Sequence, residues 1–254
     1  MRGVEAGLKL NLLQRQLHMN FGAYHYKYTD LQLSRYNPTI LVTTISNASA
    51  AKVRGVEADF SYEPGSVPNL RFFGAISYNI AKYSKSFLSA CWIGQTIAEG
   101  CSVDVDGNGI GDFQDLDGRP LPRAPKWAGN IGFSYSTSIG NGLKLGLDNR
   151  LVYQSRSFLS QESLPFAERP ETLLLDAGLR FSDEDDRWEL AVIGKNLTNK
   201  FYAVSGTQES GTGDPATTGT NSGLRADYWG AIHRGREILL RATLRFGAGA
   251  RSSN

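Results

Sequence analysis

The chain has 254 residues, and 27 Lys and Arg against 25 Asp and Glu give it a net charge of +2. So small a charge, spread without basic runs, gives no reason to expect a nucleic-acid partner. No stretch approaches 18 consecutive apolar residues, which excludes a helical membrane span. Plentiful glycine and aromatic residues beside a hydrophobic fraction of 41% suit short, half-exposed strands better than a helical core.

Apolar and polar side chains alternate in about nine segments, and this period of two predicts strands. In 4–12, for example, Val4, Ala6 and Leu8 share one face with Leu10 and Leu12. The predicted strands cover 4–12, 17–33, 40–47 with 53–62, 70–80, 127–135, 143–154, 173–181, 188–195 and 237–246. The fold class predicted from them is all-β and antiparallel.

The polar faces of these strands carry charges, such as Glu57 and Asp59 between Val56, Ala58 and Phe60. Carboxylates are costly in a dry core but cheap in a water-filled or plugged lumen. The pattern therefore favours a transmembrane β-barrel segment with apolar side chains outward. Aromatic residues near strand ends suit the two aromatic girdles of such a barrel; they are Tyr62, Tyr78, Trp127, Tyr135, Tyr153, Trp188 and Tyr202.

The links between the predicted strands alternate in length. Short links at 14–16, 63–69, 138–142 and 182–187 alternate with long ones at 34–39, 84–125, 156–170 and 203–234. Outer-membrane barrels show this alternation, because their periplasmic turns are short and their extracellular loops are long. Loop 84–125 is the longest, and such a loop is unusual inside a compact soluble domain.

Three motifs on these strands together resemble the β-barrel of TonB-dependent outer-membrane receptors. The family's "GKNL(T/D)(N/D)xxY" segment is matched by Gly194, Lys195, Asn196, Leu197, Thr198, Asn199 and Tyr202. Its "xGxE" strand start is matched by Gly55 and Glu57, and its "LPxxPxW" strand entry by Leu121, Pro122, Pro125 and Trp127. Each motif is short, but their order and their places on predicted strands agree.

The resemblance implies that residues 1–246 form the C-terminal part of a receptor barrel of about 22 strands, followed by an extension at 247–254. It implies active uptake, in a bacterial outer membrane, of scarce bulky solutes such as iron–siderophore complexes. The expected partners are outer-membrane lipid and lipopolysaccharide, a small-molecule substrate, and the TonB complex acting through an N-terminal plug. The chain shows neither a plug nor an apolar signal segment at Met1–Glu5, so we expect a truncated sequence.

Two alternatives remain open at this point. One is a passive outer-membrane channel, and the other is a soluble calcium-binding β-sandwich. An enzyme is not expected, because the three histidines (His18, His25 and His233) accompany no G-x-S-x-G or comparable nucleophile segment. No cofactor is expected apart from calcium.

The only two cysteines, Cys91 and Cys101, both fall in the long loop 84–125. Two nearby cysteines without histidine partners predict a disulfide in an oxidising compartment rather than a zinc site.

The same loop has the ligand spacing of a calcium site. Asp104, Asp106, Asn108, Ile110 (through its carbonyl), Asp112 and Asp115 fall at positions 1, 3, 5, 7, 9 and 12, with Gly109 at position 6. Asp115 is shorter than the usual bidentate Glu, and no helices are predicted beside the loop. A structural calcium ion and a plain acidic surface loop are the two interpretations.

Overall fold

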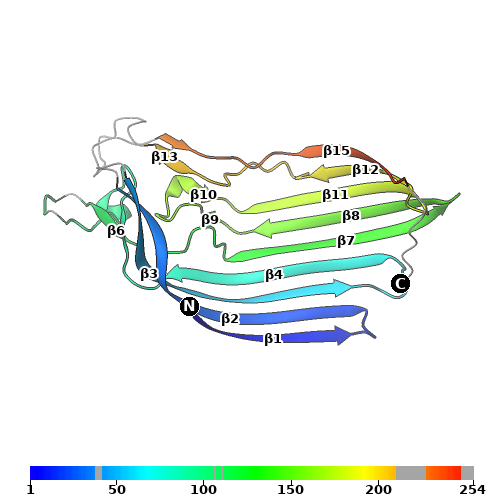
Figure 1. Cartoon of the computed structure of the whole chain (residues 1–254), viewed down its shortest axis with the longest axis horizontal. Helices are drawn as coiled ribbons and strands as arrows, with labels where there is room; N and C mark the ends of the chain where they lie inside the picture. The colour runs from blue at the N-terminus through cyan, green and yellow to red at the C-terminus, as the bar shows by residue number, and fades with distance from the viewer. Residues whose placement is uncertain (38–41, 106, 110, 210–226, 247–254) are drawn as a thin grey trace.

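The computed structural model describes residues 1–37, 42–105, 107–109, 111–209 and 227–246. Nine strands form one antiparallel sheet whose order follows the sequence, with β1 and β15 as its edges (Figure 1). They are β1 (Arg2–Leu12), β2 (Leu17–Asn37), β3 (Val42–Tyr62), β4 (Leu70–Tyr83), β7 (Trp127–Gly140), β8 (Leu143–Gln154), β11 (Thr172–Asp183), β12 (Trp188–Lys195) and β15 (Glu237–Leu244). The prediction of nine antiparallel strands is confirmed.

The remaining elements lie within the long connections. Three small hairpins pair β5 (Leu88–Ala90) with β6 (Phe113–Asp115), β9 (Ser157–Phe158) with β10 (Glu168–Arg169), and β13 (Thr207–Glu209) with β14 (Asp227–Trp229). Two 3-10 turns, η1 (Ile97–Glu99) and η2 (Pro165–Ala167), are the helical elements described. In the part of the chain that the structure describes, no helix is long and apolar enough to cross a membrane.

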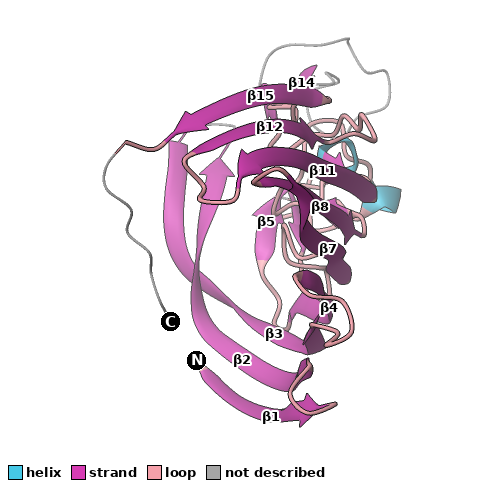
Figure 2. Ribbon diagram, turned by 90° about the vertical axis from the view of Figure 1, so that its right-hand side faces the viewer, coloured by secondary structure: helices cyan, strands magenta, loops and turns pink. Residues whose placement is uncertain are grey.

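The sheet is a curved single layer (Figure 2). All short turns lie at one end of the strands, at the right in Figure 1, and the long connections lie at the other. One short turn is Asn141-Gly142, whose φ angles of 53° and 71° are those that a two-residue hairpin turn needs. Because the nine strands belong to one sheet rather than two packed sheets, the β-sandwich alternative is wrong.

Several strands begin or end a few residues from their predicted bounds, and in β2 and β3 the difference changes how the strands pair. The segments 40–47 and 53–62 form one strand, β3, from Val42, and β2 continues to Asn37 to pair with it. The register of this pair shifts between Tyr28 and Leu31, beside Asp30 with a φ of 57°. A bulge of this kind lets two long strands remain paired where the alternation in the sequence is interrupted.

The register aligns the apolar residues of neighbouring strands across the whole sheet. One row runs from Leu8 through Phe21, Ala58, Ile76, Gly129 and Tyr153 to Leu173. We call the side that carries these residues the apolar face. None of the described residues covers it, since Val4, Ile76 and Leu240 are 71%, 54% and 82% exposed. The sheet therefore has no interior of its own.

The opposite side, the polar face, carries hydrogen-bonded and charged pairs. Arg180 Nε lies 2.9 Å from Asp148 Oδ2, and Arg241 Nη2 lies 2.9 Å from Glu189 Oε1. Asn20 Nδ2 donates to Asp59 Oδ2 at 2.8 Å. These pairs lie on the face predicted to be polar, as expected for the lining of a lumen.

Candidate functional site

The long connections pack on one another, and this packing forms a loop layer over one end of the sheet. Its largest buried cluster joins Trp92 of connection 84–126 to Leu159, Leu164 and Ala167 of connection 155–171. Ala203 and Tyr228, from the connection between β12 and β15, pack against the same cluster. Three connections that are distant in sequence thus share one apolar core. The loop layer is the candidate site, because its packed connections form the surface at the long-connection end of the sheet.

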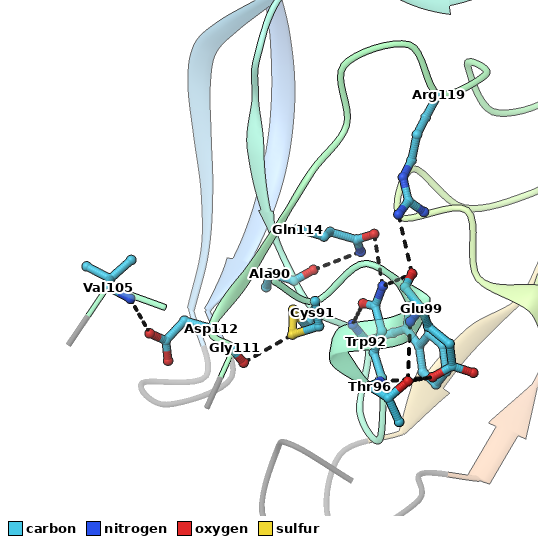
Figure 3. The surroundings of a disulfide bond; sticks show 12 residues. Ala90, Cys91, Trp92, Thr96, Glu99, Val105, Gly111, Asp112, Gln114 and Arg119 are labelled. Atoms are coloured by element: carbon cyan, nitrogen blue, oxygen red, sulfur yellow. Dashed lines mark hydrogen bonds between the residues drawn. A yellow bond between two sulfur atoms is a disulfide. The ribbon is translucent and has the colours of Figure 1, made fainter. Parts of the chain in front are cut away.

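A disulfide between Cys91 and Cys101, with Cα atoms 5.6 Å apart, braces the first of these connections (Figure 3). Two fully buried glutamines lie beside it. Gln95 Nε2 donates to Glu99 O at 3.1 Å and to Gln114 Oε1 at 3.3 Å, and Gln114 Nε2 donates to Ala90 O at 3.3 Å. Because buried amides are costly when unpaired, these bonds fix the disulfide segment to the β5–β6 hairpin.

A second buried cluster, of Tyr83, Phe87 and Leu116, fastens this connection to the end of β4. Asp115 supports it, because its carboxylate accepts hydrogen bonds from Ser86 Oγ at 2.8 Å and from the N–H groups of Phe87 and Asp117 at 3.0 Å. Burial raises the pKa of Asp115, but these hydrogen bonds and the charge of Arg119 outweigh it, so the pKa is lowered overall.

The carboxylates among the predicted calcium ligands accept hydrogen bonds from different segments of the connection. Asp104 accepts hydrogen bonds from Gly107 N at 2.7 Å and Gly109 N at 2.8 Å, and Asp112 accepts one from Val105 N at 2.9 Å. These bonds curl the loop around Asp104. Asp115 instead uses both carboxylate oxygens on the segment before β5. Asp106 and Ile110 lie outside the described residues, and the calcium site stays a prediction.

The Asn196 motif ends β12 in a tight polar turn. Asn196 is 3% exposed, and its Nδ2 donates to Lys200 O at 2.8 Å and Arg234 O at 3.0 Å. Its Oδ1 accepts from Lys200 N at 3.0 Å, and its own N–H donates to Asp176 Oδ1 at 2.8 Å. The left-handed φ of 47° at Asn196 suits asparagine. Asn196 thus bonds to β11 through its backbone N–H, and to the segment leading to β15 through its side chain.

Tyr202, at the end of this motif, is 7% exposed, and its ring contacts a guanidinium group and an imidazole ring. The Arg169 guanidinium lies 4.3 Å from its ring centroid, and the His233 ring stacks on it at 4.7 Å. The prediction of Tyr202 as a girdle residue is therefore wrong, because a buried ring covered by Arg169 and His233 cannot lie at a lipid boundary. Arg169 and His233 also tie β10 and the approach to β15 to the same point.

The other motif residues lie on β3 and at the start of β7. A Cβ at Gly55 would come within 2.5 Å of Tyr24 Oη, so the Tyr24 ring needs glycine there. Glu57 is two residues on, with its side chain on the polar face against Gly22. Pro122 and Pro125 lead into β7, where Trp127 packs on Tyr78 with ring centroids 4.6 Å apart.

The contacts that build the loop layer could not be predicted from the sequence. Trp92, Leu159, Leu164 and Ala167 show no period in the sequence, and Arg169 lies 33 residues before Tyr202. The cysteine pair was the one usable signal, because a covalent link needs only two residues of the right type.

An antiparallel sheet with one apolar and one charged face, and with all long connections at one end, is the architecture of a β-barrel segment of the outer-membrane type. A family model of the TonB-dependent receptor-like β-barrel matches residues 1–197. The chain therefore belongs to the TonB-dependent receptor β-barrel family, which is a family of receptors and transporters and not an enzyme class.

Solved structures agree with this fold. The ferric yersiniabactin uptake receptor FyuA from Yersinia pestis aligns over 96% of this chain and 30% of its own, with a TM-score of 0.65 and 12% identity. The siderophore receptor PiuA from Acinetobacter baumannii aligns over 94% of this chain and 27% of its own, with a TM-score of 0.61 and 18% identity. BauA, the ferric preacinetobactin receptor of the same organism, aligns over 94% of this chain and 29% of its own, with a TM-score of 0.54 and 20% identity. The chain thus spans less than a third of the length of these receptors. Comparison with curated protein sequences found no match.

Proposed function

We propose that the chain is the C-terminal part of the barrel of an outer-membrane receptor that actively takes up scarce, bulky solutes such as iron–siderophore complexes. The energy comes from TonB, acting through a plug domain. The observation that carries this proposal is the nine-stranded sheet, apolar on one face and charged on the other, with its loop layer at one end. Membership of the receptor family and the names of the structural neighbours support it.

The apolar face supports the membrane part of the proposal. In water, so large an uncovered apolar surface is unfavourable, whereas hydrocarbon solvates it at no such cost. Leu240 and Arg241 are adjacent on β15 and point to opposite faces. We expect a polarity-sensitive probe on a single cysteine at position 240 to be quenched by lipid-borne quenchers, and one at position 241 by aqueous iodide. Equal iodide quenching at both positions would contradict the membrane location.

The loop layer supports the solute part. Phe166 of η2 is 63% exposed on this layer, and its ring centroid lies 6.3 Å from that of Trp92, which belongs to the buried cluster. An exposed aromatic ring held in place by a buried one offers a surface against which the apolar or aromatic groups of a solute can pack.

The experiment uses the receptor in cells grown under iron limitation. Radiolabelled ferric siderophores of different chemistry are screened for binding and for uptake, with and without a functional TonB. We expect binding in both strains and uptake only with TonB. Equal uptake in both strains would favour a passive channel instead. Phe166→Ala removes an exposed ring of the loop layer and should weaken solute binding without lowering barrel stability, while Phe21→Ala on the apolar face is the control.

A further inference from the structure

Three tyrosines form a ladder along the polar face of β2. Tyr24, Tyr26 and Tyr28 are alternate residues of the strand, so their side chains point to the same side of the sheet. The ring centroids of Tyr24 and Tyr26 lie 5.6 Å apart, and those of Tyr26 and Tyr28 lie 6.3 Å apart. We call these three residues the tyrosine ladder. It places aromatic rings on the side of the sheet that lines the lumen in our proposed function.

Glycines on the neighbouring strands let two of these rings lie along the sheet. The Tyr24 ring reaches over Gly55 of β3, and its Oη donates to Asn79 Oδ1 of β4 at 3.2 Å. The Tyr26 ring lies over Gly3 of β1, where an added Cβ would come within 2.2 Å of Tyr26 Cδ1. Both tyrosines are only half-buried. The rings therefore cover the strands on either side of β2 and remain accessible from the polar face.

A hollow of about 760 Å³ opens beside the ladder on the polar face of β1, β2 and β3, which lie side by side (Figure 1). This is within the usual size range of small-molecule sites. Gly7 and Gly22, which lie opposite each other in the register of β1 and β2, form part of its lining. Glycines within strands often mark a place where a ligand comes close to the backbone. We call this space the tyrosine hollow.

The other side chains of the tyrosine hollow are mostly acidic. Glu5, Glu57 and Asp59 face it together with a single cation, Lys9. Among the described residues, none of these four takes part in an ion pair. Carboxylates of β8 and β12 on the same face do pair with arginines. The tyrosine hollow therefore holds an excess of negative charge that the sheet itself does not neutralise.

The rings and the carboxylates favour the same kind of ligand. The face of an aromatic ring is negative and attracts a cation placed within about 6 Å of its centroid. Glu5 lies opposite Tyr24 in the register of β1 and β2, and the Glu57 side chain lies over Gly22. A cation above the paired glycines would meet ring and carboxylates together, whereas an anion would be repelled by both.

We propose that the tyrosine hollow binds a positively charged organic group of the transported solute, an ammonium or guanidinium group. The Glu5 and Glu57 carboxylates accept its hydrogen bonds or neutralise its charge, and the Tyr24 and Tyr26 rings pack against it. This inference rests on the proposed function only in making the polar face the lining of the solute path. It adds the charge class of the solute, because it favours cationic chelates over anionic ones.

The test uses the purified receptor in a non-ionic detergent and titration calorimetry with two small probes. Choline carries a trimethylammonium group, and 3,3-dimethylbutan-1-ol has the same shape without the charge. We expect choline to bind on the order of tenfold more tightly or better. Glu5→Gln with Glu57→Gln should weaken choline on the order of tenfold. Tyr24→Leu should weaken it about threefold.

The matched control removes two negative charges from exposed connections, as Asp117→Asn with Glu171→Gln. If both double variants lose choline equally, only net charge matters and the proposal is overturned. Equal affinity for the two probes, no choline binding by the intact receptor, or unchanged binding in the Glu5 and Glu57 variant or in Tyr24→Leu overturns it too. Should the double variant fail the heat-shift gel assay for a folded barrel, Glu57→Gln alone is measured, with Glu171→Gln as its control.

The choline measurement needs neither transport nor TonB. In cells, uptake is compared for a ferric trihydroxamate with a free ammonium group and for the same chelate with that amine acetylated. A receptor that binds choline in the tyrosine hollow but takes up no ferric chelate would overturn the proposed function alone. A receptor that takes up the acetylated chelate as fast as the ammonium form would overturn this inference alone.

Discussion

Leu197 lies directly over Gly194, so that a Cβ added at residue 194 would come within 2.6 Å of Leu197 Cδ2. The chain reverses at Asn196 and folds the Leu197 side chain back onto the strand it has just left. This contact explains why glycine and leucine occur three residues apart in the motif.

The first prediction concerns this contact. Gly194→Ala should lower the free energy of unfolding by about 1–3 kcal/mol, because an extra methyl in a filled space forces its neighbours to move. Urea unfolding followed by tryptophan fluorescence measures the change. Gly178→Ala on β11 is the control, since its nearest atom would be an ordinary 3.8 Å away. Equal effects of the two substitutions would contradict the prediction.

The second prediction is that Asn196→Ala lowers the free energy of unfolding by about 2–3 kcal/mol. The substitution removes a buried side chain and leaves backbone groups of Lys200 and Arg234 without partners. The same unfolding assay measures it. Lys200→Ala is the control, since Lys200 offers only its backbone to Asn196. We expect the control to lie within about 0.5 kcal/mol of wild type.

The third prediction concerns Cys91 and Cys101. Mass spectrometry of the exported protein should find the chain two protons lighter than the reduced form. The double Cys→Ser variant should lose on the order of 2–3 kcal/mol of loop stability through the unfolded-state entropy of a short closed loop, seen as faster proteolysis between β4 and β7. Two free thiols in the exported protein would show that the pair is not bridged there.

The fourth prediction is a pH dependence of the same connection. The folded-state pKa of Asp115 is lowered from the ordinary 3.8. Its contribution to stability is therefore complete above pH 3.8 and is lost as the pH falls through the lowered pKa. Asp115→Asn should weaken the connection at neutral pH and remove this loss in acid. Amide hydrogen exchange of β5 and β6 measures it, and Asp117→Asn is the control.

Glu162 should make the stability of the loop layer depend on pH in the direction opposite to that of Asp115. Burial raises its pKa from the ordinary 4.5, although hydrogen bonds from its own N–H and from Ser160 offset part of the effect. A raised carboxyl pKa favours the protonated form in the folded state. The loop layer should therefore lose stability as the pH rises through the range from 4.5 upward, and Glu162→Gln should abolish that loss.

The last prediction is calcium binding at Asp104, Asp106, Asn108, Ile110, Asp112 and Asp115. In the structure the Asp115 carboxylate, at position 12, accepts hydrogen bonds from Ser86 and Phe87. Titration calorimetry on the receptor should show calcium binding that Asp106→Ala abolishes and Asp117→Asn leaves intact. An identical calcium response of Asp106→Ala and wild type would reject the site.

The sequence by itself determined the sheet. In Leu143 to Tyr153, as in the other strands, alternation reports which face each side chain takes, and this depends only on the two-residue period of an extended backbone. The order of the strands followed from the short links between them. The bulge of β2 was not predictable, because it depends on how β2 and β3 pair rather than on either strand alone.

Only the tertiary structure decided the loop layer and the alignment of four cations across neighbouring strands. Trp92, Leu159 and Tyr228 meet from three connections, and Tyr202 is enclosed by Arg169 and His233, because contacts between irregular segments have no period that a sequence can display. Arg2, Lys27, Lys52 and Lys82 are ordinary scattered cations along the chain. They become neighbours because register places one residue of each strand opposite one of the next, and register is a property of paired strands.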